Sequence, residues 1–302
     1  EVVVDSTLAP GHLTLAEFVV PGQSDDEILV HTHVCHPSLA NDNLAGIAVA
    51  VELARSCGRS RPRHTWRFIF APGTIGSLTW LALRPQVLPR VRAGLVLGLL
   101  GDGAPLQYKR SRRGDTLTDR AAAHVLAGIE AARLLDFEPY GYDERQYGSP
   151  GFDLPVGRLT RSVNGGYPEY HCSADDMTLL RPESLAGALQ ALARLAQVLD
   201  GNRRLLNLSP FGEPRLGRRG LYRSTGGHAP GAFEHALLWV LSQSDGTHDL
   251  LAIAERARLP FEAIEAAAEA LQQAGLLRDL APDEPAPAFT IPGSQTPKGT
   301  PT

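Results

Sequence analysis

The chain has 302 residues, of which 43% are hydrophobic and 21% charged, and its formal net charge is −4. This is the composition of an ordinary globular protein, and the acidic balance argues against a general affinity for nucleic acid or anionic lipid. No apolar run reaches the roughly 18 to 20 residues that span a bilayer, and three scattered cysteines do not make a disulfide framework. We therefore expect a cytoplasmic protein with no membrane and no nucleic-acid partner.

Short apolar runs alternate with amphipathic stretches over about the first 200 residues. The alternation predicts an α/β fold with a mostly parallel sheet flanked by helices. In such sheets a ligand site is expected at the carboxyl ends of the strands. Strands are predicted over 27–31, 65–71, 93–100 and 154–159, and helices after a cap at Asp42 or Asn43, from 73 to about 85, over 117–135 and over 182–199.

Four segments are predicted along the chain. Residues 1–210 should form the α/β domain, 211–231 a Gly- and Arg-rich linker, and 282–302 a Pro-rich disordered tail. Between them, residues 232–281 contain three helical stretches ending in GLL, which indicates a small winged-helix-like α domain. The first residues, EVVVDSTLAPGH, lack an initiator Met and the features of a signal peptide, so we expect more chain upstream.

The predicted recognition helix of the winged-helix-like module is acidic. It carries Glu262, Glu265 and Glu269, with no Lys or Arg before Arg278. Phosphates would repel such a helix. The module is therefore expected either to contact a protein partner or to pack against another part of the same chain, and a DNA-binding regulator is the less favoured alternative.

The stretch THVCHPSLANDNLAG (32–46) and the distant segment YPEYHCSADD (167–176) concentrate histidines and carboxylates. His33 follows a predicted strand, Asp42 opens a predicted helix, and His171 lies in the second segment. Imidazole and carboxylate are the usual ligands of a catalytic zinc, which keeps a position open for water. A polar loop without chemistry is the alternative interpretation. Asp175 is close enough in sequence to His171 to orient it.

Five blocks give the chain a resemblance to a known family. Over about residues 25 to 200 it resembles the co-catalytic zinc aminopeptidases. It resembles most closely a subgroup of them that has a C-terminal winged helix and is often labelled polysaccharide-biosynthesis-related. The blocks are HVCHPSLANDN, APGTIGS, YKRSRRGD, DERQYGSPGF and YPEYHCSADD. The resemblance implies a zinc aminopeptidase-like α/β core, with His33 and His171 as metal ligands and Asp42 as the metal-bridging carboxylate.

Several family positions are changed here. The Asp after the first histidine is Cys35, the Glu-Glu pair falls on Gly73 and Thr74, and a later metal-binding Asp falls near Gly98 or Leu99. The family's two-zinc site is therefore not expected unaltered. One zinc on His33, Asp42 and His171 is the prediction.

A proton-transferring base is then needed near the zinc. Glu144 is the first candidate and Asp143 is nearly equal, because the DERQY block lies where the family brings residues to the substrate. Glu169 is third and is better suited to orienting His171. For Asp143 and Glu144 a surface salt bridge, or a replacement metal ligand, is the alternative role.

Other residues are expected to support the site. Cys35 is predicted beside the metal, with a thiolate nucleophile as the minor alternative, and His36 is predicted to make a structural hydrogen bond or to serve as an extra ligand. The cations Arg110, Arg112 and Arg113 either clamp a substrate carboxylate or phosphate, since the planar guanidinium suits such groups, or belong to a solvated loop. Tyr147 is predicted to wall the substrate pocket, with local packing as the alternative.

The sequence thus predicts a zinc-dependent hydrolase of amide or peptide bonds. Its substrate would be a small peptide or an aminoacylated small molecule, as when an aminoacyl or peptidyl group is trimmed from a biosynthetic intermediate. The alternative is a catalytically degenerate protein that binds a ligand or partner through the old cleft. Loss of the Glu-Glu pair favours the alternative, and the retained DERQY and YPEYH blocks oppose it.

Overall fold

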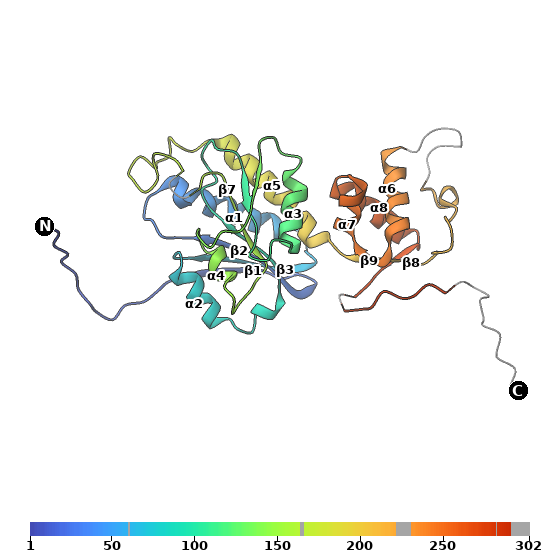
Figure 1. The fold of residues 1–302 in the computed structure, drawn as a ribbon, viewed down its shortest axis with the longest axis horizontal. Coiled ribbons are helices and arrows are strands. Elements are labelled where there is room, and N and C mark those ends of the chain that lie inside the picture. The colour runs from blue at the N-terminus through green and yellow to red at the C-terminus, as the bar shows by residue number, and fades with distance from the viewer. Residues whose placement is uncertain (60, 164–165, 222–230, 282, 291–302) are drawn as a thin grey trace, which may run out of the picture. The chain divides into compact units, whose positions relative to one another are not determined.

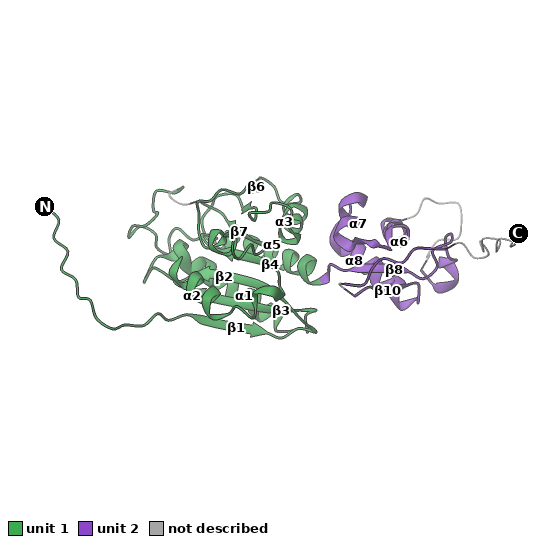
Figure 2. Cartoon of the chain, turned by 60° about the horizontal axis from the view of Figure 1, so that its bottom comes forward, with its two compact units in different colours: residues 1–200 green, residues 201–302 purple. Residues whose placement is uncertain are grey.

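The structure, a computed structural model, describes residues 1–59, 61–163, 166–221, 231–281 and 283–290. The chain divides into two compact units, residues 1–200 and 201–302 (Figure 2). Each unit is described by itself below.

The first unit is built on a seven-stranded mixed sheet in the order β1-β3-β2-β4-β7-β5-β6. The four central strands are parallel, β1 pairs antiparallel with β3, and β5 pairs antiparallel with β7. This confirms the predicted α/β fold with a mostly parallel sheet. The strands are β1 (Ala16–Val20), β2 (Ser24–His33), β3 (His64–Ala71), β4 (Val91–Leu97), β5 (Gln107–Lys109), β6 (Arg133–Leu135) and β7 (Val156–Thr160).

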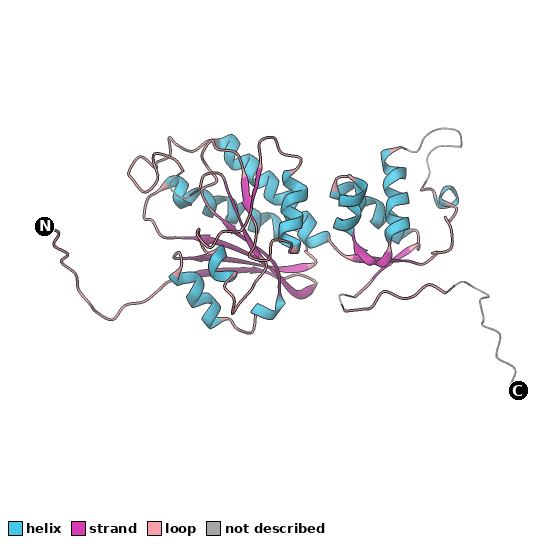
Figure 3. Cartoon of the chain, in the orientation of Figure 1, coloured by secondary structure: helices cyan, strands magenta, loops and turns pink. Residues whose placement is uncertain are grey.

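Helices cover both faces of this sheet. In Figures 1 and 3, α2 and α4 lie on one side of it and α1 and α5 on the other. On the α2 side, Trp80 and Tyr147 pack against strand residues such as Leu29 and Ile69, all fully buried. The helices are α1 (Gly46–Cys57), α2 (Ile75–Leu83), α3 (Leu117–Leu126), α4 (Glu144–Tyr147) and α5 (Pro182–Gly201), with short turns at Ala40–Ala45 and Leu88–Arg90.

Three sequence predictions within this unit are corrected. The helix predicted over 117–135 ends at Leu126, and 133–135 instead form β6, which pairs with β5. The strand predicted to reach Leu100 ends at Leu97. Asp42 and Asn43 are not helix caps: both have non-helical backbone angles inside a wide turn over Ala40–Ala45, and α1 begins only at Gly46.

The second unit contains a three-stranded antiparallel sheet and three helices. Strand β8 (Arg204–Asn207) lies between β9 (Asp245–Asp249) and β10 (Leu277–Asp279). The helices are α6 (Ala232–Gln243), α7 (Leu250–Ala257) and α8 (Phe261–Gln273), and a short turn spans Leu216–Arg219. This is the predicted winged-helix arrangement.

The predicted boundary after residue 210 has to move toward the N-terminus. Because β8 pairs with β9 and β10, its backbone hydrogen bonds assign it to the second unit, which begins at Gly201. Residues 222–230 of the predicted linker, and residues 282 and 291–302 of the predicted tail, lie outside the described residues. Within the described part of the chain, the helices are all too short or too polar to cross a bilayer.

Candidate metal centre

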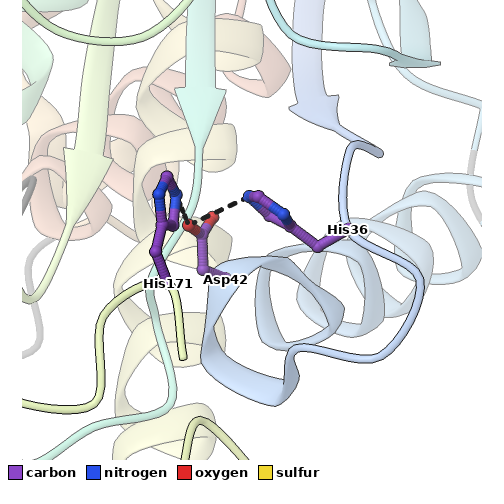
Figure 4. A group of neighbouring side chains, drawn as sticks. All are labelled: His36, Asp42 and His171. Carbon is purple, nitrogen blue, oxygen red and sulfur yellow. Dashed lines mark ion pairs between the residues drawn. The ribbon is translucent and has the colours of Figure 1, made fainter. Parts of the chain in front are cut away.

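Three imidazoles surround one buried carboxylate at the carboxyl end of β2. Asp42 is fully buried, and its Oδ1 lies 2.6 Å from Nε2 of His33, the last residue of β2. Its Oδ2 lies 3.1 Å from Nε2 of His171 and 3.5 Å from Nε2 of His36 (Figure 4). The structure therefore brings together residues separated by more than a hundred positions in the chain, as the sequence predicted.

The group formed by His36, Asp42 and His171 fits a metal ion. One ligand atom from each residue lies within 4.8 Å of the others. The Oδ2 atom of Asp42 is buried and has no hydrogen-bond partner among the described residues, which leaves a lone pair for a cation. Two imidazoles and a carboxylate are ligands typical of zinc.

His36, predicted to make a structural hydrogen bond or to serve as an extra ligand, lies near the second oxygen of the same carboxylate. Its Nε2 is 3.5 Å from Oδ2 of Asp42, whereas Nε2 of His33 lies 2.6 Å from Oδ1. His36 is only partly exposed and His171 about half exposed, so the group faces solvent on the side of these two rings.

The histidines keep Asp42 ionised. Burial alone would raise the pKa of its carboxyl, but the hydrogen bond from His33 and the positive charges of His33, His36 and His171 outweigh burial and lower the pKa. An ionised carboxylate is the form that binds a cation.

Asp175 holds the two ligand-bearing segments together. Its carboxylate accepts hydrogen bonds from the backbone N–H of Asn41 at 2.6 Å, the backbone N–H of Asp42 at 3.1 Å and the hydroxyl of Tyr167 at 2.9 Å. Its backbone carbonyl accepts from the N–H of Ala40. Asp175, predicted to orient His171, therefore fixes the backbone of Asp42 instead.

Two asparagines beside Asp42 join this turn to the central strands. Asn41 had no predicted role, and Asn43 had been predicted only as a possible helix cap. Asn43 donates to the hydroxyl of Thr32 at 2.6 Å and accepts from the N–H of Leu99 at 3.2 Å. Asn41 accepts from the N–H of Gly101 at 2.8 Å. The hydrogen bonds of the ANDN block thus hold Asp42 at the ends of β2 and β4. In the sequence, the two asparagines on either side of Asp42 are the feature that could have indicated this positioning role.

Tyrosine rings support the histidines. Tyr142 stacks on His33 with ring centroids 4.8 Å apart, and Tyr170 stacks on His171 at 3.9 Å. Stacking of this kind restricts ring orientation. Tyr147, predicted as a pocket wall, is instead fully buried, and its hydroxyl lies 2.9 Å from Nδ1 of His31.

Glu144, the first candidate base, is engaged elsewhere. It is buried, and its Oε1 lies 2.7 Å from Nζ of Lys109 and 3.5 Å from Nη1 of Arg158. Among its contacts in the described structure, none reaches the Asp42 group. Its carboxylate is therefore paired with these two cations and not with the Asp42 group.

Asp143 lies close to the backbone of Gly73 and Thr74, where the predicted Glu-Glu pair is absent. A Cβ atom on Gly73 would lie 3.0 Å from Sγ of Cys35 and 4.0 Å from Oδ2 of Asp143. The other oxygen of Asp143 accepts from the N–H of Thr74 at 2.7 Å and from the hydroxyl of Ser77 at 2.6 Å. A carboxylate of the DERQY block is therefore held next to these two positions.

His31 pairs with Asp143 beneath the site. Its Nε2 lies 3.2 Å from Oδ2 of Asp143, and both side chains are buried. Burial raises the pKa of Asp143, but His31, Ser77 and the Thr74 N–H outweigh it and lower that pKa to about 2. The pair can hold or pass a proton between imidazole and carboxylate.

Cys35 is not set up as a nucleophile. Its Sγ accepts the N–H of Gly73 at 2.8 Å. Burial raises the pKa of the thiol, and the nearby negative charges of Asp143 and Asp42 raise it further, against the lowering effect of the Gly73 hydrogen bond. A thiol that resists ionisation is a weak nucleophile.

The three arginines, predicted either as a substrate clamp or as part of a solvated loop, contact Gly114 and Asp153. Arg110 donates to the carbonyl of Gly114, Arg112 pairs with Asp153 at 2.8 Å, and Arg113 lies 4.0 Å from the same carboxylate. The structure thus does not bring them to the Asp42 group. Glu169 contacts Cys172 through its backbone carbonyl, and its catalytic role stays a prediction.

Comparison with known proteins identifies relatives for both units. A family model described as a domain of unknown function (DUF4910) matches residues 4–202, and a winged helix-turn-helix model matches residues 203–279. The Clostridium acetobutylicum protein "Putative polysaccharide biosynthesis protein with aminopeptidase-like domain" is 41% identical over 280 residues, which cover 92% of this chain. The chain spans 64% of that relative's length.

Solved structures also show similarity to this chain. A crystal structure of a "putative peptidase" from Clostridium acetobutylicum superposes with a TM-score of 0.81 at 37% identity, covering 88% of this chain and 60% of that one. BSAP, a zinc aminopeptidase from Bacillus subtilis, gives a TM-score of 0.54 at 18% identity over 61% of this chain and 49% of its own, a likeness of fold alone. The predicted resemblance, an aminopeptidase-like fold with a C-terminal winged helix, is confirmed.

Proposed function

Because the chain belongs to the DUF4910 family and its first unit has the fold of zinc aminopeptidases, we propose that it is a zinc-dependent hydrolase of amide or peptide bonds. The observation that carries the proposal is the buried, ionised Asp42 surrounded by His33, His36 and His171, with Oδ2 left open. The substrate we propose is a small peptide or an aminoacylated small molecule.

His36, Asp42 and His171 would hold one zinc ion. Zinc bound there would polarise the substrate carbonyl and lower the pKa of a water molecule. His33 fixes the remaining oxygen of Asp42, and the partly exposed rings of His36 and His171 leave an approach for the substrate from solvent.

We assign proton transfer to Asp143 with His31. Asp143 lies beside Cys35 and Gly73, where the Glu-Glu pair is absent, and Ser77 and Thr74 fix its orientation. With a pKa of about 2, the carboxylate of Asp143 alone is a weak proton acceptor. We therefore assign His31, whose Nε2 lies 3.2 Å from Oδ2 of Asp143, to accept the proton together with it.

Metal content is the first test. The full chain, loaded with zinc and dialysed, should retain one zinc ion, and His171→Ala and His36→Ala should each lose it. His33→Ala should weaken zinc affinity about 10- to 100-fold, because it removes only the group that orients Asp42. His248→Ala is the matched control, since it breaks an imidazole–carboxylate pair (3.1 Å to Asp245) in the other unit. Stoichiometric zinc in His171→Ala would contradict the assignment.

Turnover is the second test. A panel of aminoacyl 4-nitroanilides should be cleaved by the zinc-loaded chain, with activity lost to chelator and restored by zinc. Asp143→Asn should lower kcat about 10²- to 10⁴-fold while leaving bound zinc unchanged. Asp153→Asn, which removes a partly exposed carboxylate paired with Arg112, should leave kcat unchanged.

The binding-module alternative makes a different prediction. Its support is the weak basicity of Asp143 and the absence of a glutamate at Gly73. A chain that binds one zinc through His36 and His171 but turns over no member of the panel would favour this alternative.

A further inference from the structure

A second polar site lies beside the candidate metal centre. It is a cavity of about 340 Å³ whose lining includes Lys109 on β5, Arg158 on β7, and Tyr140 and Gly141 on the loop before α4. We propose that this cavity binds a negatively charged group of the substrate, a carboxylate or a phosphate.

The buried charges of this site do not balance. Lys109 and Arg158 are each 4% exposed, and among the described residues Glu144 is the one buried carboxylate paired with them. Two cations against one anion leave a net charge of about +1 away from water, which is unfavourable unless an anion joins them. Asp136 and Glu138 also line the cavity, but both are exposed, and Asp136 lies 3.7 Å from Arg110, so water screens them.

Arg158 supplies the free donor. Its Nε is buried and has no hydrogen-bond partner within the part of the chain that the structure describes. The planar guanidinium presents donors in a fork that matches carboxylate and phosphate oxygens. The ammonium of Lys109 contributes positive charge but no free donor. Its Nζ donates to the backbone carbonyls of Glu138 and Tyr140 and lies 2.7 Å from Oε1 of Glu144.

One aromatic ring separates this cavity from the metal centre. The Cζ of Arg158 lies 5.4 Å from the ring centroid of Tyr142, and the same ring stacks on His33. If the proposed hydrolase activity holds, a substrate with its scissile amide at Asp42 could place an anionic group against Arg158. The proposal therefore narrows the substrate to amides with a nearby carboxylate or phosphate.

An arginine in the apolar strand VGRLT is the sequence feature behind this site. Strand β7 is otherwise buried and uncharged, and Arg158 is the charge in it. The sequence analysis had chosen Arg110, Arg112 and Arg113 from YKRSRRGD as substrate-binding cations. The buried cation of this block is instead Lys109, the last residue of β5.

Anion binding can be measured without zinc. The metal-free full chain is titrated with inorganic phosphate and, separately, with glutarate, by calorimetry and by amide NMR shifts. Arg158→Gln should weaken binding at least tenfold, and Arg158→Lys, which keeps the charge but lacks the fork, at least threefold. Glu144→Gln removes the balancing carboxylate and should tighten binding severalfold. The surface control Arg112→Gln and the metal-ligand variant His171→Ala should bind like the wild type.

The outcomes separate the two proposals. Binding of neither anion, or equal binding by wild type and a folded Arg158→Lys chain, would overturn the anion site whatever the zinc experiments show. Loss of zinc-dependent turnover with phosphate or glutarate binding intact would instead overturn the hydrolase. Tighter binding of phosphate than of glutarate would identify a phosphate group, and the reverse a carboxylate. In the active enzyme, kcat/KM for glutamyl over glutaminyl amides should exceed tenfold and fall toward one in Arg158→Lys.

Discussion

At the scale of single residues, the position of a residue within a motif was a better guide to the candidate site than its residue type. Asp42 and His171 were identified because each lies in a block with several defined neighbours. His36 was predicted to make a structural hydrogen bond or to serve as an extra ligand, and the structure places its Nε2 3.5 Å from Oδ2 of Asp42. Glu144 and Asp143 are adjacent in sequence, yet one is neutralised by cations while the other faces Cys35, a difference that no spacing rule contains.

Asp143 should make stability depend on pH. Its folded pKa of about 2 lies below the roughly 3.9 of an unfolded aspartate, so the stabilisation is complete above about pH 4 and is lost as pH falls toward 2. The difference between these two pKa values corresponds to about 2.6 kcal/mol. Urea unfolding of wild type and Asp143→Asn should show a gap that is largest at pH 7 and narrows between pH 4 and pH 2.5. The exposed Asp136→Asn should show no such gap, and a gap independent of pH would contradict the assignment.

At the scale of elements, segments with a clear apolar run were predicted and three-residue strands were not. The strands β2, β3, β4 and β7 were recognised from their apolar runs, although β2 extends on both sides of the predicted 27–31, and the helix α5 was recognised from its length. Three-residue strands such as β5 and β6 owe their existence to pairing with a neighbour, so their own sequence carries little signal. The Ala-rich run after residue 117 has the propensity to continue as helix, but pairing of 133–135 with β5 prevails.

The YKRSRRGD loop should depend on one carboxylate. Asp119 accepts from the hydroxyls of Tyr108 at 2.8 Å, Ser111 at 2.5 Å and Thr116 at 2.7 Å, and it completes the capping box of α3. Replacing it with alanine leaves several buried donors unpaired, which should cost about 2 to 4 kcal/mol of unfolding free energy. The measurement is urea denaturation against the exposed Asp115→Ala, and equal stability of the two variants would refute the role.

At the scale of the whole molecule, two units with different chemistry share one chain. The residues proposed to hold a metal and the cavity proposed to bind an anion belong to residues 1–200, and the winged-helix unit follows in the chain. Helix α8 of the second unit carries Glu262 and Glu269, so contact with a protein partner rather than DNA stays our prediction for it.

Zinc should therefore protect only the first unit. At a free zinc concentration of 100 times Kd, binding would stabilise the folded state by about 2.7 kcal/mol. Hydrogen exchange measured with zinc and with chelator should differ in peptides covering 33–45 and 167–176. Peptides from α6, α7 and α8 are the internal control and should exchange equally in both conditions. Equal changes in both units would show that the ion acts on the whole chain.

The bridge made by Asp175 has a consequence for how the ion would arrive. Because its carboxylate already ties the Asp42 turn to the His171 loop, the apoprotein presents its ligands in a preorganised arrangement. Zinc capture should then occur in a single bimolecular phase, without a slower rearrangement that saturates at high ion concentration. The Asp175→Ala variant lacks these hydrogen bonds, and its zinc binding should therefore show two phases.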